Sequence, residues 1–241
     1  MTPGTVALRQ EITQLPLVAD NSSFSAHIPG LQIAIDSTSL GEFKLCPRRY
    51  FYSIIRGWQP RAESVHLTFG LLLHASVERY EHARTQGQPH DEALHFALRW
   101  ALAQTWNRDL GRGWISDHPL KNRFTLVRTL VWYLDAFGAN DPLVTAFLPN
   151  GKPAVELSFS FASGLIAEST GEEFTLCGHL DRVATLNEVP YIVDIKTTGS
   201  TISPSFFAKF SPDNQFSMYS LAARIAFALP VRGIIVDGIQ I

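Results

Sequence analysis

The sequence predicts an α/β fold in which a helical N-terminal half precedes a mixed sheet flanked by helices. Apolar residues recur at helical spacing between residues 36 and 140, whereas strand-like patterns dominate residues 150–241. The chain has 241 residues, of which 46% are hydrophobic and 17% are charged, so it can bury a sizeable core. We expect residues 1–35 to form a polar N-terminal arm and residues 36–241 to form one domain.

The N-terminal half contains several helical segments. Ser39 and Glu42 fit a capping box, and the apolar residues after them predict a first helix that runs to about Ile55. Pro47 lies inside this helix, where a proline is unfavourable because it lacks a backbone donor. Further helices are expected over residues 66–86, 90–108 and 120–138.

Strand patterns begin after residue 150. Three strands are expected over residues 153–162, 173–186 and 189–196. Asn187 and Glu188 are enough for a hairpin turn between the last two strands. A helix is expected over residues 213–229 and a buried strand over residues 231–236. Because the chain ends on an apolar, strand-like run, we expect the natural protein to continue beyond Ile241.

The composition excludes several classes of protein. The net charge of −2 excludes a generally basic nucleic-acid coat protein but leaves room for a local basic groove. No stretch approaches the roughly 18 apolar residues of a membrane span, and the N-terminus lacks a signal-peptide pattern. The two cysteines, Cys46 and Cys177, are too few for a disulfide framework, so we expect a reducing compartment, the cytoplasm.

One segment near the N-terminus combines basic and aromatic residues. Residues 43–62 include five basic residues and no acidic residue. The five aromatic residues of this segment are Phe43, Tyr50, Phe51, Tyr52 and Trp58. Basic side chains neutralise phosphates and aromatic faces stack on unpaired bases, so the segment fits a nucleic-acid path. The alternative is a half-buried amphipathic helix whose aromatic residues belong to the core.

Two acidic residues and a lysine fall on neighbouring predicted strands. Asp194 and Lys196 are two residues apart, so on a strand both side chains point to one face while Ile195 points into the core. A hairpin would bring Asp181 alongside Asp194. Two carboxylates and the backbone carbonyl of Ile195 suit a hard divalent cation such as Mg²⁺ or Mn²⁺. The lysine would orient a water molecule or stabilise developing charge.

Short motifs of this kind also arise by chance. A second acid-x-lysine triplet, residues 42–44, lies in a predicted helix, where residues two apart do not share a face, and we discard it. His74 and Glu78 are four residues apart and share a helix face. Gln215 and Tyr219 have the same spacing. Either pair alone is usually ordinary packing, and only the order of all these elements along the chain is informative.

Seven short motifs follow one another along residues 36–237. They are Ser37-Thr38-Ser39-Leu40, Cys46-Pro47-Arg48-Arg49-Tyr50, Phe69-Gly70 leading to His74, Glu156, Gly178-x-x-Asp181, Asp194-Ile195-Lys196 and Gln215-x-x-x-Tyr219. This order resembles the RecB-like branch of the PD-(D/E)XK nuclease superfamily, which includes CRISPR-adaptation nucleases and phage exonucleases. The resemblance implies a restriction-endonuclease-like core, in which a bend at Pro47 is acceptable.

The resemblance also implies a role for each motif residue. The implied metal ligands are His74, Asp181, Asp194 and the carbonyl oxygen of Ile195. The implied catalytic residues are Lys196, Asp181 and Asp194. The implied supporting residues are Gln215, Tyr219 and Glu156. The implied DNA path is lined by Arg48, Arg49 and Tyr50, and phosphate contacts are also expected from Lys44 and Arg56.

We therefore expect a Mg²⁺- or Mn²⁺-dependent deoxyribonuclease, exonuclease-like, that acts on single-stranded DNA or DNA ends. Iron–sulfur members of this branch use four cysteines, so no such cluster is expected within residues 1–241. The sequence shows neither a G-x-S-x-G elbow nor a P-loop, so an acyl hydrolase and an NTPase are unsupported. One alternative is a weak or inactive nuclease-fold module that binds DNA within a recombination, repair or phage complex. Another is a metal-free structural domain with solvated carboxylates.

Overall fold

The computed structural model describes residues 6–8, 23–61 and 64–241. The chain divides into two compact units that alternate along the sequence. Unit 1 comprises residues 1–60, 158–180 and 212–231, and unit 2 comprises residues 61–157, 181–211 and 232–241. Much of the expected N-terminal arm, residues 1–35, lies outside the described residues. Its described parts include two short strands, β1 (Val6–Leu8) and β2 (Ala34–Ile35).

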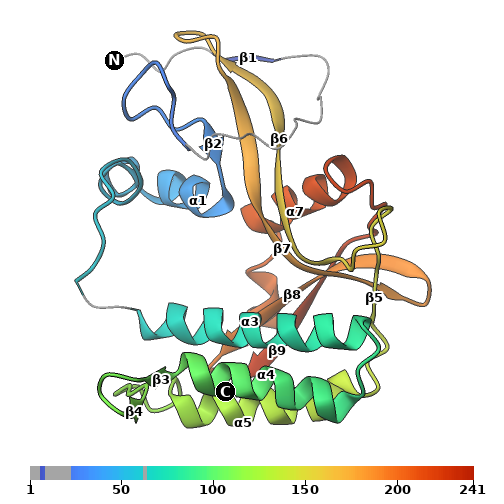
Figure 1. Cartoon of the computed structure of the whole chain (residues 1–241). Helices are drawn as coiled ribbons and strands as arrows, with labels where there is room; N and C mark the ends of the chain where they lie inside the picture. The colour runs from blue at the N-terminus through green and yellow to red at the C-terminus, as the bar shows by residue number, and fades with distance from the viewer. Residues whose placement is uncertain (1–5, 9–22, 62–63) are drawn as a thin grey trace. The chain divides into compact units, whose positions relative to one another are not determined.

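Unit 1 combines strands with short helices (Figure 1). Strand β1 pairs antiparallel with the end of β6 (Val155–Ala167), and β2 pairs parallel with β7 (Glu173–Leu186). The helical elements are α1 (Ser37–Leu45), α2 (Pro47–Tyr50), the π-helical turn η1 (Phe51–Ile55) and α7 (Asn214–Ile225). Both long strands also contribute to unit 2, through residues 155–157 of β6 and 181–186 of β7.

Helix α1 starts differently from the predicted helix. The side chain of Asp36 accepts a hydrogen bond from Ser39 N at 2.6 Å, and Ser39 Oγ accepts one from Asp36 N at 3.2 Å. The predicted capping box of Ser39 and Glu42 is therefore wrong, because an aspartate three residues earlier is an equally good N-cap. The helix also ends at Leu45, and Pro47 opens α2, where the first position needs no backbone donor. The proline thus separates two helices.

Unit 2 contains the three helices that periodicity predicted. They are α3 (Val65–Thr85), α4 (His90–Gln104) and α5 (Arg123–Tyr133), the last continued by the π-helical turn η2 (Leu134–Gly138). Helix α4 ends before residue 108 because β3 (Trp106–Asn107) and β4 (Arg112–Gly113) pair as a small separate sheet. Among the residues that the structure describes, no helix combines the length and apolar character that a membrane crossing requires.

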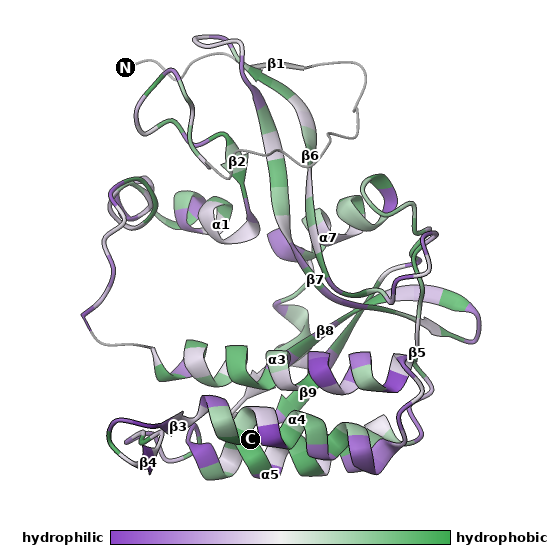
Figure 2. Cartoon of the chain, in the orientation of Figure 1, coloured by the Kyte–Doolittle hydropathy of each residue, from purple (hydrophilic) through white to green (hydrophobic). Residues whose placement is uncertain are grey.

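Strand β8 (Val189–Thr198) is the central strand of unit 2. It pairs antiparallel with β7 and parallel with β9 (Ile234–Gln240), so the sheet is mixed, as predicted. The short strand β5 (Val144–Thr145), which the sequence did not predict, also pairs with β7, and helix α6 (Pro204–Ala208) follows β8. Residues 192–195 are all buried, which is typical of a strand covered on both faces. Apolar residues accordingly dominate β8 and β9 in Figure 2.

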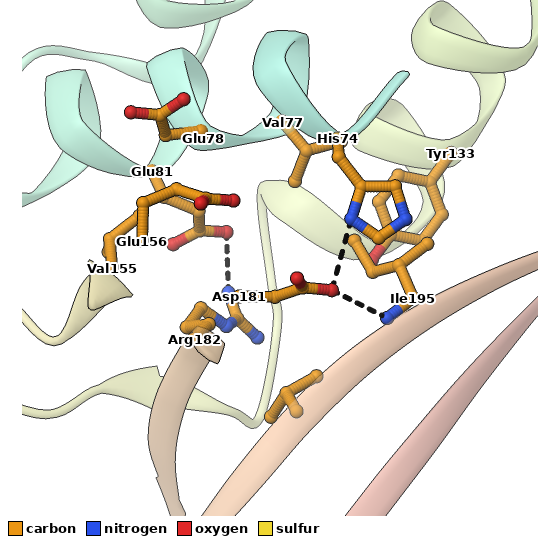
Figure 3. Close-up of a pocket in the computed structure, with 11 residues that line it drawn as sticks. His74, Val77, Glu78, Glu81, Tyr133, Val155, Glu156, Asp181, Arg182 and Ile195 are labelled. Carbon is orange, nitrogen blue, oxygen red and sulfur yellow. Dashed lines mark hydrogen bonds and ion pairs between the residues drawn. The ribbon is translucent and has the colours of Figure 1, made fainter. Parts of the chain in front are cut away.

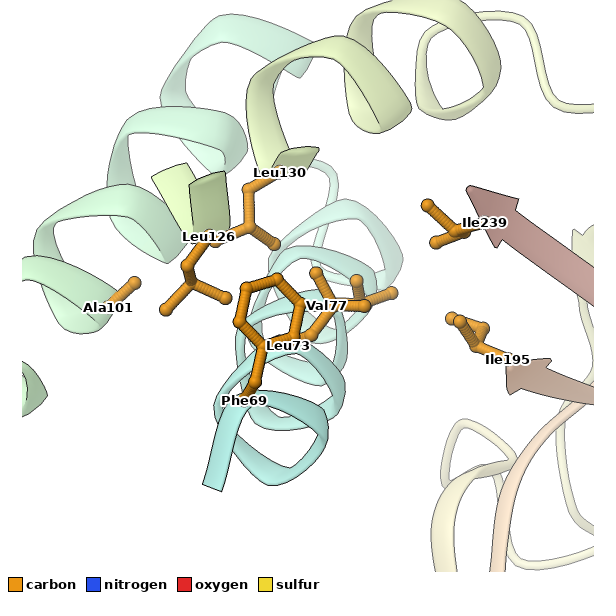
Figure 4. Packing of buried hydrophobic residues seen from close by; sticks show 8 residues of the cluster. All are labelled: Phe69, Leu73, Val77, Ala101, Leu126, Leu130, Ile195 and Ile239. Carbon is orange, nitrogen blue, oxygen red and sulfur yellow. The ribbon is translucent and has the colours of Figure 1, made fainter. Parts of the chain in front are cut away.

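The helices and the sheet of unit 2 share an apolar core. Phe69, Leu73 and Val77 follow one another at helical spacing on α3 and are almost completely buried. They cluster with Ala101, Leu126, Leu130, Ile195 and Ile239 (Figure 4). Each large side chain buried in this way contributes roughly 1.5–3 kcal/mol, so the cluster holds α3 against β8.

Candidate functional site

The turn between β7 and β8 determines which residues face each other. Residues 187–188 have φ values of 49° and 67°, the left-handed conformation of a two-residue hairpin turn. The ladder that starts at this turn ends at the pair of Arg182 and Val193. The next residue on each strand is an aspartate, Asp181 on β7 and Asp194 on β8. The predicted hairpin is confirmed, and it brings the two acidic residues to the same end of the ladder.

His74 reaches Asp181 from helix α3. Its Nδ1 lies 3.0 Å from Oδ2 of Asp181, and the same oxygen accepts a hydrogen bond from the Ile195 N–H at 3.3 Å (Figure 3). Burial by itself lowers the pKa of His74, but the hydrogen bond to Asp181 and the charges of Asp181 and Asp194 outweigh it, so the pKa is raised above 6.5. The imidazole therefore holds its proton more readily than a free histidine does.

Asp194 and Lys196 form an ion pair on β8. Lys196 Nζ lies 2.8 Å from Oδ2 and 3.1 Å from Oδ1 of Asp194. Asp194 is fully buried, whereas the Lys196 side chain is 27% exposed. Burial raises the pKa of Asp194 to about 6, with Lys196 opposing the shift and Asp181 adding to it. Ile195 points into the apolar core, as predicted, and the metal contact of its carbonyl oxygen stays a prediction.

A small acidic pocket adjoins His74 and Asp181. Its charged lining residues are His74, Glu78, Glu81, Glu156, Asp181 and Arg182 (Figure 3). Asp194 and Lys196 do not line this pocket, but both act on His74 through their charge. The free volume of about 20 Å³ is enough for a water molecule or an ion and too small for a nucleotide.

Glu156 enters this pocket from an unusual point of β6. Its φ of 48° is rare for a residue other than glycine, and such a conformation costs of order 1–3 kcal/mol. Burial raises the pKa of Glu156 to about 7, with the charges of Asp181 and Glu78 acting in the same direction and His74 opposing them. The strand thus holds a carboxyl group that ionises near neutral pH beside the pair of His74 and Asp181.

Replacing Glu156 with glutamine should stabilise the metal-free protein at pH 8. The folded protein binds more protons than the unfolded chain between pH 4.5 and about 7, so the contribution of Glu156 to stability falls as pH rises through this window. Glutamine does not ionise. We therefore expect Glu156→Gln to raise the free energy of unfolding at pH 8 by about 1–3 kcal/mol more than it does at pH 4.5. Urea unfolding in EDTA measures it, with the exposed Glu92→Gln as control. An equal effect at both pH values would contradict this assignment.

Sequence reasoning missed three polar residues of the pocket, namely Glu81, Tyr133 and Arg182. Tyr133 Oη donates to Oδ2 of Asp237 at 2.6 Å, and burial together with Asp237 raises the pKa of Tyr133 well above 10. Arg182 contacts Glu81 across the pocket (Figure 3). For Glu81 the sequence did contain a signal. Glu81 follows Glu78 by three residues, so the two side chains share a face of α3.

The expected supporting pair, Gln215 and Tyr219, lies in unit 1. Gln215 Nε2 donates to Tyr219 Oη at 2.6 Å, so the predicted shared face of α7 is confirmed. The Tyr219 ring is buried and meets the Phe159 ring edge-on at 6.3 Å. These contacts are internal to unit 1, and support of the catalytic lysine by this pair stays a prediction.

The predicted DNA path also lies in unit 1. Its exposed cations are Lys44, Arg48, Arg49 and Arg56. Arg49 Nε lies 2.6 Å from Glu42 Oε2, so one of these charges is already paired. Tyr50 is partly buried and donates to Gln32 Oε1 at 2.7 Å. Of the other aromatic residues, Phe43, Phe51 and Trp58 are exposed and Tyr52 is partly buried. The segment is therefore neither wholly core nor wholly surface.

The donors expected to bind metal are present as two contacting pairs. In the described part of the chain, no group of three or more His, Cys, Asp or Glu side chains is arranged to hold a metal ion. The carboxylates instead contact nitrogen atoms of the protein itself, Asp181 the imidazole of His74 and Asp194 the ammonium of Lys196. The chemistry of the donors still fits a divalent cation, because carboxylate oxygens and an imidazole suit Mg²⁺ or Mn²⁺ and the adjoining pocket has room for an ion.

Comparison with known proteins identifies the family of the chain. A family model of the PD-(D/E)XK nuclease superfamily matches residues 37–236. A search of curated proteins gave no match. The match spans the helices of both units, the hairpin and the acid-x-lysine triplet of β8, while assignment to the RecB-like branch stays a prediction. The chain belongs to the PD-(D/E)XK nuclease superfamily.

Proposed function

We propose that the chain is a Mg²⁺- or Mn²⁺-dependent deoxyribonuclease of the RecB-like branch that hydrolyses phosphodiester bonds from DNA ends. The observation that carries this proposal is the arrangement at the end of the β7–β8 ladder. Asp181 and Asp194 both lie there, and Asp181 contacts His74 while Asp194 contacts Lys196. Membership of the superfamily supports nuclease chemistry, and the exposed basic segment of unit 1 supports a nucleic-acid substrate.

His74, Asp181 and Asp194 are the side chains that would hold the divalent ion, with the carbonyl oxygen of Ile195. When bound, the ion polarises the scissile phosphate and lowers the pKa of a water molecule. Ligation requires a neutral imidazole, so a proton competes with the metal for His74, and the raised pKa of His74 strengthens that competition. An iron–sulfur cluster is not part of this proposal, because the chain has two cysteines.

Lys196 acts next to the reacting phosphate in this proposal. Its ammonium is held by Asp194 yet remains 27% exposed, so it can approach a bound phosphodiester. A fixed positive charge stabilises the negative charge that develops during in-line attack by water, and it orients the attacking water. Asp194 fixes the position of this ammonium through contacts at 2.8 and 3.1 Å.

Incubation of the purified chain with labelled DNA tests this function. The substrates are single-stranded and double-stranded DNA, linear or covalently closed, each with Mg²⁺, Mn²⁺ or EDTA. We expect metal-dependent loss of linear DNA that Asp194→Ala abolishes. Cleavage of closed circles would show endonuclease action instead. Binding without cleavage in every metal condition would favour an inactive DNA-binding module of a recombination, repair or phage complex.

The exposed cations of unit 1 should act through phosphate contacts. We expect Arg48→Gln to weaken DNA binding without sequence preference and to reduce the slope of log K against log salt by about 0.9 for duplex DNA. Arg49→Gln should reduce the slope less, because Glu42 already pairs with Arg49. Fluorescence anisotropy at several salt concentrations measures both slopes. An unchanged slope for Arg48→Gln would remove this segment from the DNA path.

Both thiols, Cys46 and Cys177, are unpaired. This state supports the reducing, cytoplasmic location that we propose for the protein.

A further inference from the structure

Arg182 forms a buried ion-pair network directly beside Asp181. Its Nη1 lies 2.5 Å from Oε1 of Glu81 and its Nη2 lies 2.9 Å from Oδ2 of Asp141. The second oxygen of Glu81, Oε2, accepts a hydrogen bond from Thr145 Oγ1 at 2.8 Å. Both carboxylate oxygens of Glu81 therefore have partners. The side chains of Arg182 and Glu81 are only 10% and 12% exposed, so little solvent weakens their attraction.

Glu81 would otherwise be a further acidic group of the pocket. It lies seven residues after His74, two helical turns along the same face of α3, and it lines the pocket with Glu156 and Asp181. A hard divalent cation accepts any carboxylate of suitable geometry. A free Glu81 would thus compete with Asp181 for the ion and draw it along α3.

We propose that Arg182 is a positioning residue that keeps the Glu81 carboxylate paired and so unable to bind the cation, which directs the divalent ion to His74, Asp181 and Asp194. This inference rests on the proposed function. Arg182 is the neighbour of Asp181 on β7, and Glu81 and His74 share α3, so the same contact also joins the two elements that bring His74 to Asp181. Asp141, the other partner of Arg182, has a side chain that is 21% exposed, so water can solvate it when Arg182 is replaced.

A two-residue cycle with Mn²⁺ tests the proposal. Mn²⁺ dissociation constants are measured by electron paramagnetic resonance for the wild type, Glu81→Gln, Arg182→Met and the double variant, together with kcat and KM for DNA cleavage. We expect Glu81→Gln to stay within about 3-fold of the wild type, because Glu81 is no ligand. Arg182→Met should lower kcat for DNA cleavage at least 10-fold, with KM for DNA nearly unchanged. It should also change the Mn²⁺ dissociation constant. Adding Glu81→Gln to Arg182→Met should return both values to within about 3-fold.

Rescue by the second substitution separates positioning from a structural role. If Arg182 only supported the fold, loss of Glu81 as well would give no recovery, and that result would overturn the proposal. A 10-fold loss of Mn²⁺ affinity in Glu81→Gln alone would also overturn it, because Glu81 would then be a ligand. If Arg182→Met does not fold, Arg182→Lys takes its place in the cycle. The double variant Arg182→Lys with Glu81→Gln should then have a Mn²⁺ dissociation constant and a kcat closer to the wild type than Arg182→Lys alone.

A wild type that neither binds Mn²⁺ nor cleaves DNA would refute the proposed function. The contact of Arg182 with Glu81 is then judged by urea unfolding of the same four proteins. We expect Arg182→Met to raise the unfolding equilibrium constant more than about 100-fold, and the second substitution to recover at least 10-fold, because an unpaired buried carboxylate is removed. If the effects of the two single substitutions on the unfolding equilibrium constant multiply in the double variant, Arg182 and Glu81 do not act as a unit.

Discussion

Replacing Lys196 with alanine should lower kcat for DNA hydrolysis by about 100- to 1,000-fold. The phosphate gains negative charge on the way to the transition state, and removal of one fixed electrostatic donor typically has an effect of this size. The ammonium of Lys196 lies 2.8 Å from Asp194 and remains partly exposed, so it is placed to act on a bound phosphate. Single-turnover cleavage with saturating enzyme and Mn²⁺ measures the chemical step.

Two comparisons make this result specific. Lys152→Ala removes an exposed lysine of the same unit and should leave the rate within about 2-fold. If Lys196→Ala does not fold, Lys196→Gln is tested in its place. Glutamine keeps more of the side chain over Asp194. A Lys196 variant that folds and cleaves within about 3-fold of the wild type would show that the ammonium does not take part in the reaction.

Asp181→Asn should weaken Mn²⁺ binding by at least about 100-fold. Asparagine has nearly the same shape and can still accept the hydrogen bond from the Ile195 N–H, so the substitution removes mainly the negative charge that faces His74. Loss of groups that merely orient metal ligands already costs 10- to 100-fold in affinity, and loss of a ligand should cost at least as much. Isothermal titration with Mn²⁺ gives the affinity.

The matched control for Asp181→Asn is Asp91→Asn, on the exposed face of α4. It should bind Mn²⁺ as the wild type does. An Asp181→Asn variant with unchanged Mn²⁺ affinity would remove Asp181 from the ligand set, whatever its cleavage rate.

The sequence predicted the hairpin that carries the acidic residues because two signals agreed there. Side chains alternate between the two faces of a strand, so the apolar pattern shows which residues of β7 and β8 point to which face. A two-residue turn then allows only one pairing register between the two strands. With the turn at residues 187–188, that register alone places Asp181 and Asp194 at the same end of the ladder. The inward direction of Ile195 followed from the same alternation.

Other features depended on contacts that no local pattern contains. Arg182 and Glu81 are 101 residues apart in the chain, and their pairing arises only when α3 packs on the sheet. The left-handed backbone of Glu156 occurs inside a sequence that looks like an ordinary alternating strand. The predicted start of α1 was wrong because Asp36 and Ser39 are both good N-cap residues. The choice between them depends on the geometry of the preceding strand β2.

The anomalous difference map of a crystal soaked in Mn²⁺ tests the central claim most directly. We expect one peak within bonding distance of carboxylate oxygens of both Asp181 and Asp194, with the His74 imidazole turned toward it. No peak at these carboxylates, or a peak held by Glu78, Glu81 and Glu156 alone, would contradict the account.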